Sequence, residues 1–143
     1  MLLDTHEIVK AIVNSYRGIG AIVEFGVGFN PWVACTLKKV LPHVRIIVVD
    51  RDQRVLDYVR HTCPDLEVKL DDVTRLNVDE YRDVEMFYSI RPPPELIPYM
   101  EDIARRVKAT LIIRPLTEGE SGYLFDERKW IKINPHIYVL RWI

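Results

Sequence analysis

The chain has 143 residues, the usual size of one domain, and 48% of them are hydrophobic while 29% are charged. This composition excludes a disordered chain, and 20 basic against 21 acidic residues do not indicate nucleic acid or an anionic membrane as a partner. No apolar run approaches the roughly 18 residues of a membrane span, and the N-terminal sequence lacks the pattern of a signal peptide. We therefore expect one cytoplasmic domain over residues 1–143.

The first half of the chain alternates between helix and strand. An amphipathic helix ends at residues 17–20, and a short buried strand follows over 21–25. Asn30 and Pro31 begin the second helix, with Asn as the N-cap and Pro at the first helical position. The β-branched run 44–49 is typical of a central parallel strand.

The second half continues this alternation and then changes character. Its predicted elements are, in order, a helix over 53–62, a peripheral strand over 66–70, a polar loop with a short helical turn over 71–83, a strand over 84–90, a helix beginning near Pro98, a strand over 110–116, a polar loop over 117–128, and an antiparallel hairpin formed by 130–134 and 137–143. This order predicts an α/β fold with a doubly wound, mostly parallel Rossmann-like sheet and helices on both faces. The hairpin adds antiparallel strands at one edge.

Residues that follow the strands are the candidates for a ligand site, because open α/β sheets bind ligands at the carboxyl ends of their strands. Gly26 and Gly28 follow the first strand and let backbone amides approach a ligand at a helix N-terminus. Asp50 follows the second strand, about 20 residues further on, where an acidic residue holds a ribose diol in nucleoside sites. A dinucleotide fingerprint needs a third glycine, which would fall on Pro31.

The segment from Glu24 to Asn30 resembles the ExGxGxG motif of class I S-adenosylmethionine-dependent methyltransferases, with Asn30 in the last glycine position. The likeness covers the whole chain, including the final hairpin. More narrowly, the chain resembles a small archaeal family of uncharacterised Rossmann-type proteins marked by EFGVG and YSIRPP. A richness in Arg and Pro also suits a thermophile.

This resemblance implies that the chain binds S-adenosylmethionine. By matching position, Glu24 and the two glycines would surround the methionyl part, and Asp50 would accept hydrogen bonds from both ribose hydroxyls. Arg51 would lie beside the adenine, and Asp72 near its amino group. The implied cofactor-binding residues are Glu24, Phe25, Gly26, Gly28, Asn30, Asp50, Arg51, Asp72 and Val73.

The expected acceptor site follows the fourth strand. Amino-group methyltransferases of the resembled family often carry Asp, Asn or Ser followed by Pro-Pro-aromatic here, whereas in this chain Ser89 is separated from the prolines and no aromatic follows. Arg91 and Arg114 end neighbouring strands, so we hypothesise that they bind an anionic substrate group or the methionyl carboxylate. In the alternative interpretation, each arginine pairs with a loop acid such as Glu118 or Asp83. The catalytic candidates are Ser89, Arg91 and Arg114.

We expect structural roles for the other aromatic, cysteine and histidine side chains that could take part in binding or chemistry. Phe29 and Trp32 flank the glycine loop, and we expect both to pack in the core. Cys35 and Cys63 belong to no CxxC pair and the histidines are scattered, so we expect no metal site, no disulfide and an inert buried thiol at Cys35.

Two other functions remain open. One is a dinucleotide-sensing Rossmann module, although Pro31 and the terminal hairpin do not favour it. The other is a non-catalytic partner or scaffold subunit that presents the apolar edge formed by 130–134 and 137–143. Because the predicted elements account for nearly the whole chain, we expect a homodimer or a partner protein to complete any substrate site.

Overall fold

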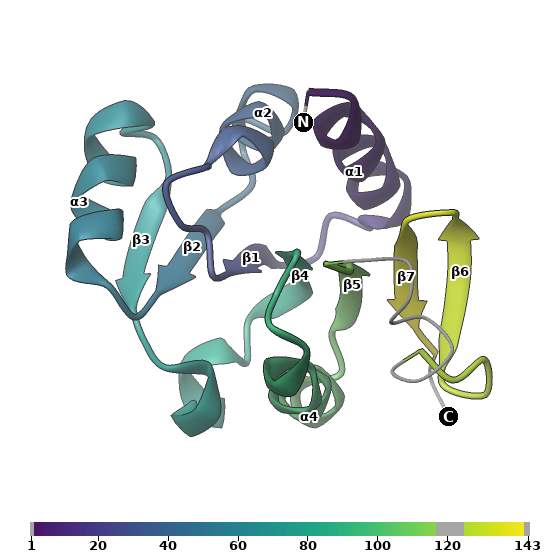
Figure 1. Ribbon diagram of the computed structural model, residues 1–143. Helices are drawn as coiled ribbons and strands as arrows, with labels where there is room; N and C mark the ends of the chain where they lie inside the picture. The colour runs from purple at the N-terminus through teal and green to yellow at the C-terminus, as the bar shows by residue number, and fades with distance from the viewer. Residues whose placement is uncertain (1, 117–124, 142–143) are drawn as a thin grey trace.

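The computed structural model describes residues 2–116 and 125–141, and the seven strands in this part form one mixed sheet with the order β3-β2-β1-β4-β5-β7-β6 (Figure 1). The strands are β1 (Ala21–Phe25), β2 (Ile46–Asp50), β3 (Glu67–Leu70), β4 (Val84–Ile90), β5 (Thr110–Arg114), β6 (Trp130–Asn134) and β7 (Ile137–Leu140). β1 to β5 pair in parallel, and β7 runs antiparallel to both β5 and β6. The predicted parallel sheet with an antiparallel C-terminal hairpin is confirmed.

Helices cover both faces of this sheet (Figure 1). One face carries α1 (Leu2–Ser15), α2 (Trp32–Val40) and α3 (Gln53–Thr62). The other carries α4 (Ile97–Val107) and the 3₁₀ turns η1 (Val73–Arg75) and η2 (Val78–Tyr81), and a further turn, η3 (Pro94–Leu96), leads into α4. The carboxyl ends of the parallel strands therefore lie at one edge of a sheet that is covered on both sides.

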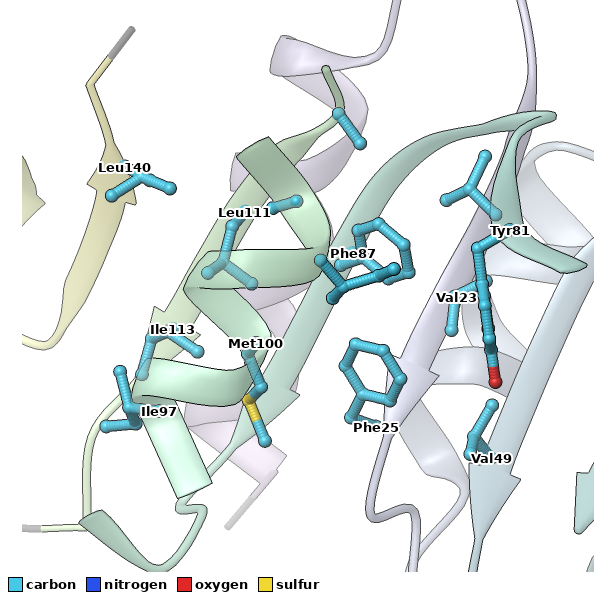
Figure 2. Packing of buried hydrophobic residues seen from close by; sticks show 14 of the residues in the cluster. Val23, Phe25, Val49, Tyr81, Phe87, Ile97, Met100, Leu111, Ile113 and Leu140 are labelled. Atoms are coloured by element: carbon cyan, nitrogen blue, oxygen red, sulfur yellow. The ribbon is translucent and has the colours of Figure 1, made fainter. Parts of the chain in front are cut away.

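The core beneath α4 is built around stacked aromatic rings (Figure 2). Phe25 of β1 stacks on Phe87 of β4 with 5.1 Å between the ring centroids, and Tyr81 lies against both. Met100 and Ile97 of α4 are buried in the same cluster. This packing fixes the end of β1, where the glycine loop begins.

The opposite face is packed with aliphatic side chains. Ile12 of α1, Leu37 of α2 and Val59 of α3 are all fully buried, and they pack against Ile22 and Val48 of the sheet. Since both of its faces are covered, β1 is buried along its whole length, as expected of a central parallel strand.

The buried carboxylate of Glu85 in β4 anchors the connection from α1 to β1. It accepts hydrogen bonds from the backbone N–H groups of Arg17 at 2.5 Å and Ile19 at 2.7 Å. The Tyr16 hydroxyl donates to the carbonyl of Gly20 at 2.6 Å. These bonds hold the end of α1 against the sheet, and α1 forms one wall of a cavity at the carboxyl ends of the strands.

Two sequence-based expectations about α2 are wrong. Cys35 of α2 and Cys63 at the end of α3 form a disulfide, with 6.1 Å between their Cα atoms, whereas no disulfide and an inert thiol were expected. Their spacing in the sequence did not indicate that neighbouring helices bring them together. α2 also begins one residue later than predicted, with Pro31 rather than Asn30 at the cap position and no side-chain cap.

The predicted loop over 117–128 lies mostly outside the described residues, as do the last two residues of the predicted hairpin. At the outer edge of the sheet, β6 exposes Ile131 and Ile133, whose relative exposures are 41% and 43%. Within 2–116 and 125–141, the helices fall short of the length and apolarity needed to cross a bilayer.

Candidate functional site

The glycine loop follows β1 and folds back onto the end of β2. Gly26 and Gly28 have φ values of +69° and +58°, a left-handed conformation that glycine adopts without steric cost. The Gly26 N–H donates to the carbonyl of Val49 at 2.8 Å, and the Gly28 N–H donates to Oδ2 of Asp50 at 3.0 Å. The loop and the carboxylate after β2, which were separate predictions, are therefore parts of one structure.

Asp50 keeps hydrogen-bonding capacity after these contacts. Its Oδ2 accepts from Gly28, and its Oδ1 accepts from the N–H of Asp52 at 3.0 Å. Each carboxylate oxygen has two lone pairs, so both oxygens can accept one further hydrogen bond. Two acceptors held side by side on a fixed backbone suit the two hydroxyls of a ribose diol.

Glu24 is the second acidic group of the site, and it is almost fully buried. The hydroxyl of Tyr88 in β4 donates to its Oε1 at 2.7 Å. Burial raises the pKa of Glu24 to about 8, the hydrogen bond from Tyr88 lowers it, and the nearby charge of Asp50 raises it. At neutral pH the carboxyl is therefore mostly neutral, and a cationic ligand group beside it would favour its ionised form.

Two cavities lie along the carboxyl ends of β1, β2 and β4. The first has a volume of about 180 Å³ and is bordered by Thr5, Glu24, Asn30 and Trp32. The second has a volume of about 350 Å³, and its polar lining residues include Asp50, Arg51, Asp71, Asp72 and Ser89. Gly26, Ile90 and Arg91 border both cavities, so the two adjoin at the ends of β1 and β4.

The far wall of the second cavity is the segment after β3. Asp72 accepts hydrogen bonds from the N–H of Thr74 at 2.9 Å and from its hydroxyl at 2.7 Å, and these bonds lower the pKa of Asp72. Val73 also lines this cavity. Asp71 accepts from the hydroxyl of Tyr81 at 2.6 Å and was not predicted, although it stands directly before Asp72 in the sequence.

The end of β4 bends at the junction of the cavities. Ser89 is buried and its hydroxyl donates to the carbonyl of Phe25 at 2.9 Å, so it joins the ends of β4 and β1. Arg91 has a φ of +50°, which is uncommon for a residue other than glycine, and its N–H donates to the carbonyl of Arg114 at 2.6 Å. This conformation turns the chain so that Arg91 borders both cavities.

The two candidate arginines are neighbours through their backbones, but only Arg91 borders the two cavities. Arg114 borders neither cavity, and its Nη1 donates to the carbonyl of Pro115 at 2.5 Å. In the alternative interpretation, Glu118 lies outside the described residues, and Asp83 instead pairs with Arg45 at 2.5 Å. The structure therefore does not support Arg114 as part of a shared anion site, while Arg91 remains a candidate anion-binding residue.

The remaining predicted residues occupy different environments. The Phe25 ring packs in the core against Phe87, and Phe25 also lines the second cavity. Phe29 and Trp32 were expected in the core but are 57% and 40% exposed. Phe29 packs edge-to-face on Tyr58 of α3, and Trp32 borders the first cavity. Phe29 lies in the turn before α2, and Trp32 is the first residue of α2. Both positions are at the rim of the sheet.

Comparison with protein families places the chain among known sequences. A family model described as an uncharacterised protein family, UPF0146, matches residues 5–141. The chain belongs to this family. The UPF0146 protein of Pyrococcus horikoshii is 36% identical over 111 residues, which cover 78% of this chain and 81% of that protein. The UPF0146 protein of Methanocaldococcus jannaschii is 36% identical over 95 residues, or 66% of each. The predicted membership of a small archaeal family is confirmed.

Solved structures similar to this UPF0146 chain include methyltransferases. A putative caffeoyl-CoA O-methyltransferase from Staphylococcus aureus superposes with a TM-score of 0.69 at 10% identity, over 96% of this chain and 81% of that one. Coclaurine N-methyltransferase, solved with N-methylheliamine and SAH, gives a TM-score of 0.57 at 13% identity. The match covers 76% of this chain, which spans only 35% of that enzyme. These similarities establish a methyltransferase-like fold.

Proposed function

We propose that the two adjoining cavities bind S-adenosylmethionine or its demethylated product, S-adenosylhomocysteine (SAH). The observation that carries this proposal is the placement of two acidic residues. Asp50 borders one cavity and Glu24 the other, and the two cavities adjoin at Gly26 and Arg91. One ligand with a ribose at one end and an α-amino acid at the other matches this arrangement.

The second cavity suits the nucleoside half of the ligand. Asp50 has one acceptor position left on each oxygen for the ribose hydroxyls. Asp71 and Asp72 line the same cavity, and an acidic oxygen there would accept from the amino group of adenine. Apolar contact with a planar base would come from Val73, Leu96 and other apolar residues that line the cavity.

The first cavity suits the amino-acid half. Glu24 would accept from the ammonium group, and ionisation of its carboxyl would strengthen the contact. Arg91 carries the opposite charge and borders the same cavity, where it would bind the carboxylate. Amino-acid recognition needs one group of each sign, and this cavity contains both.

When bound, S-adenosylmethionine would supply an electrophilic methyl group to an acceptor. The residues of this chain would bind and orient the two ends of the cofactor, which is the main demand that methyl transfer makes on a protein. Ser89 would act as a positioning residue, since its hydroxyl joins the ends of β1 and β4. We further propose that a second copy or a partner protein completes the acceptor site, and the exposed edge at Ile131 and Ile133 is a candidate contact surface.

A dinucleotide fits this site less well. Pro31 occupies the position of the third glycine in the dinucleotide fingerprint, and Pro31 is also the cap residue of α2. The antiparallel β7 between β5 and β6 further departs from the all-parallel order of dinucleotide-binding sheets. We therefore favour S-adenosylmethionine over NAD.

Calorimetric titration with SAH and with NAD tests the proposal. We expect wild-type protein to bind SAH and to prefer it to NAD, and Asp50→Asn to weaken SAH binding by at least roughly tenfold, the effect of losing one charged hydrogen bond. Asp52→Asn is the matched control, because Asp52 borders neither cavity and Asn caps α3 as well as Asp does. Tighter binding of NAD, or equal SAH affinity in wild type and Asp50→Asn, would contradict the assignment.

A further inference from the structure

A third cavity, of about 510 Å³, lies on the helical face between α2 and α3 and contains the disulfide in its wall. Cys35 and Cys63 are each half-buried, so the bond is accessible from this cavity. Lys38 and Lys39 of α2 line it, together with the acidic Asp65. Trp32 borders both this cavity and the first cavity of the candidate site.

We propose that the Cys35–Cys63 bond is a site of reversible redox modification by a dithiol, and that its state controls the ligand affinity of the neighbouring site. The first half stands on the disulfide and its cavity alone. The second half rests on the proposed function, because it requires a ligand in the two adjoining cavities.

The helices assign different roles to the two sulfur atoms. Cys35 lies in the first turn of α2, whose positive helix end stabilises a thiolate, and the two lysines of the same helix add positive charge. Cys63 is the C-cap residue of α3, where the negative helix end disfavours a thiolate. Cys35 is therefore the better leaving group, and an incoming thiolate attacks the sulfur of Cys63.

The exchange balances as a two-electron reduction. The incoming thiolate bonds to Sγ of Cys63, and the electron pair of the broken bond leaves on Sγ of Cys35. The second thiol of the reductant loses its proton and attacks the mixed disulfide, which releases Cys63. The protein gains two electrons and two protons, and the dithiol becomes a disulfide.

The disulfide can influence the candidate site because it joins α2 and α3, and each of these helices follows one part of that site. α2 follows the glycine loop and carries Trp32, and α3 follows Asp50 and Arg51. α2 packs mainly against α1, whereas α3 packs against β2 and β3. Two weaker ties also join these segments, the bond from Gly28 to Asp50 and the ring contact between Phe29 and Tyr58. Opening the covalent tie loosens the first turn of α2, which borders the first cavity, relative to α3 and to Asp50 in the second cavity.

Reaction of the native protein with dithiothreitol, followed by alkylation and mass spectrometry, tests the first half. We expect both cysteines to become alkylated without prior unfolding. With a monothiol, we expect the mixed disulfide on Cys63 and the alkyl group on Cys35. A bond that resists the reductant until the protein unfolds would overturn the proposal, and a mixed disulfide on Cys35 would overturn the assigned order of attack.

Titration with SAH tests the second half. Oxidised wild type should bind roughly fivefold or more tightly than reduced wild type, the lower limit of ordinary coupling between two sites. The double variant Cys35→Ala/Cys63→Ala should match the reduced protein and should not respond to dithiothreitol. Equal SAH affinity in the oxidised and reduced forms would overturn the coupling. Failure of the oxidised protein to bind SAH would instead contradict the proposed function, while the exchange assay still decides the redox site.

Discussion

Replacement of the buried Glu24 by Gln should change how the stability of the protein depends on pH. Gln keeps the size of the side chain and an oxygen that accepts from Tyr88, but it carries no titratable proton. Burial raises the pKa of Glu24 in the folded protein from 4.5 to about 8. Between these two pH values the folded protein holds a proton that the unfolded chain has released.

The size and sign of the effect follow from this difference. For each pH unit between the two pKa values, the free energy of unfolding of wild type falls by about 1.4 kcal/mol relative to Glu24→Gln as the pH rises. From pH 5 to pH 8 the relative loss reaches up to about 4 kcal/mol, and it levels off above the folded pKa. The two proteins should therefore have similar stability at pH 5, and the variant should be the more stable at pH 8.

Urea unfolding of both proteins at several pH values measures this difference directly, because titrations common to both cancel. Tyr88→Phe is a useful second variant. It removes the hydrogen bond that lowers the pKa of Glu24, so the fall in its stability should extend to higher pH. If the difference in unfolding free energy between wild type and Glu24→Gln stayed constant from pH 5 to pH 8, the reasoning would be refuted.

Two further predictions concern the disulfide and the glycine loop. The double variant Cys35→Ala/Cys63→Ala should lose about 3–4 kcal/mol of unfolding free energy, because the bond closes a 28-residue separation; unfolding in urea checks this, and an unchanged midpoint would contradict it. Gly26→Ala and Gly18→Ala should each cost about 1–2 kcal/mol, since their φ values are +69° and +83°. Only Gly26→Ala should also weaken SAH binding, because Gly26 borders both cavities; equal weakening by both variants would show that the effect is not local.

The fold followed closely from local sequence patterns. The β-branched run of β2 and the apolar β1 predicted central parallel strands, and both are buried on both faces of the sheet. Pro31 and Pro98 placed the starts of α2 and α4 to within a residue or two. These features depend on residues that are close together in the sequence, so a single sequence was enough to predict them.

Only part of the candidate site could be predicted from the sequence. The spacing of Gly28 and Asp50 predicted that both serve one ligand, and the structure shows them hydrogen-bonded to each other. Thr5 of α1 gave no signal, because its place beside the cavity depends on how α1 packs against α2. The contact between Glu24 and Tyr88 joins residues on neighbouring strands, and it depends on the register of β1 against β4.

The wrong predictions concern features that depend on how the elements pack in three dimensions. Cys35 and Cys63 meet only because the ends of two helices lie side by side, a relation that sequence distance does not contain. Phe29 and Trp32 are apolar, but they belong to the loop and helix end at the rim of the sheet, so hydrophobicity alone predicted their burial wrongly. Arg114 is the last residue of β5 and borders neither cavity, whereas Arg91 directly follows β4 and borders both.

A crystal structure of the protein grown with SAH tests the central claim most directly. We expect the ribose hydroxyls within hydrogen-bond distance of both oxygens of Asp50, and the amino-acid end in the cavity bordered by Glu24 and Arg91. SAH bound elsewhere on the molecule, or bound with its adenosine beside Glu24, would contradict the account.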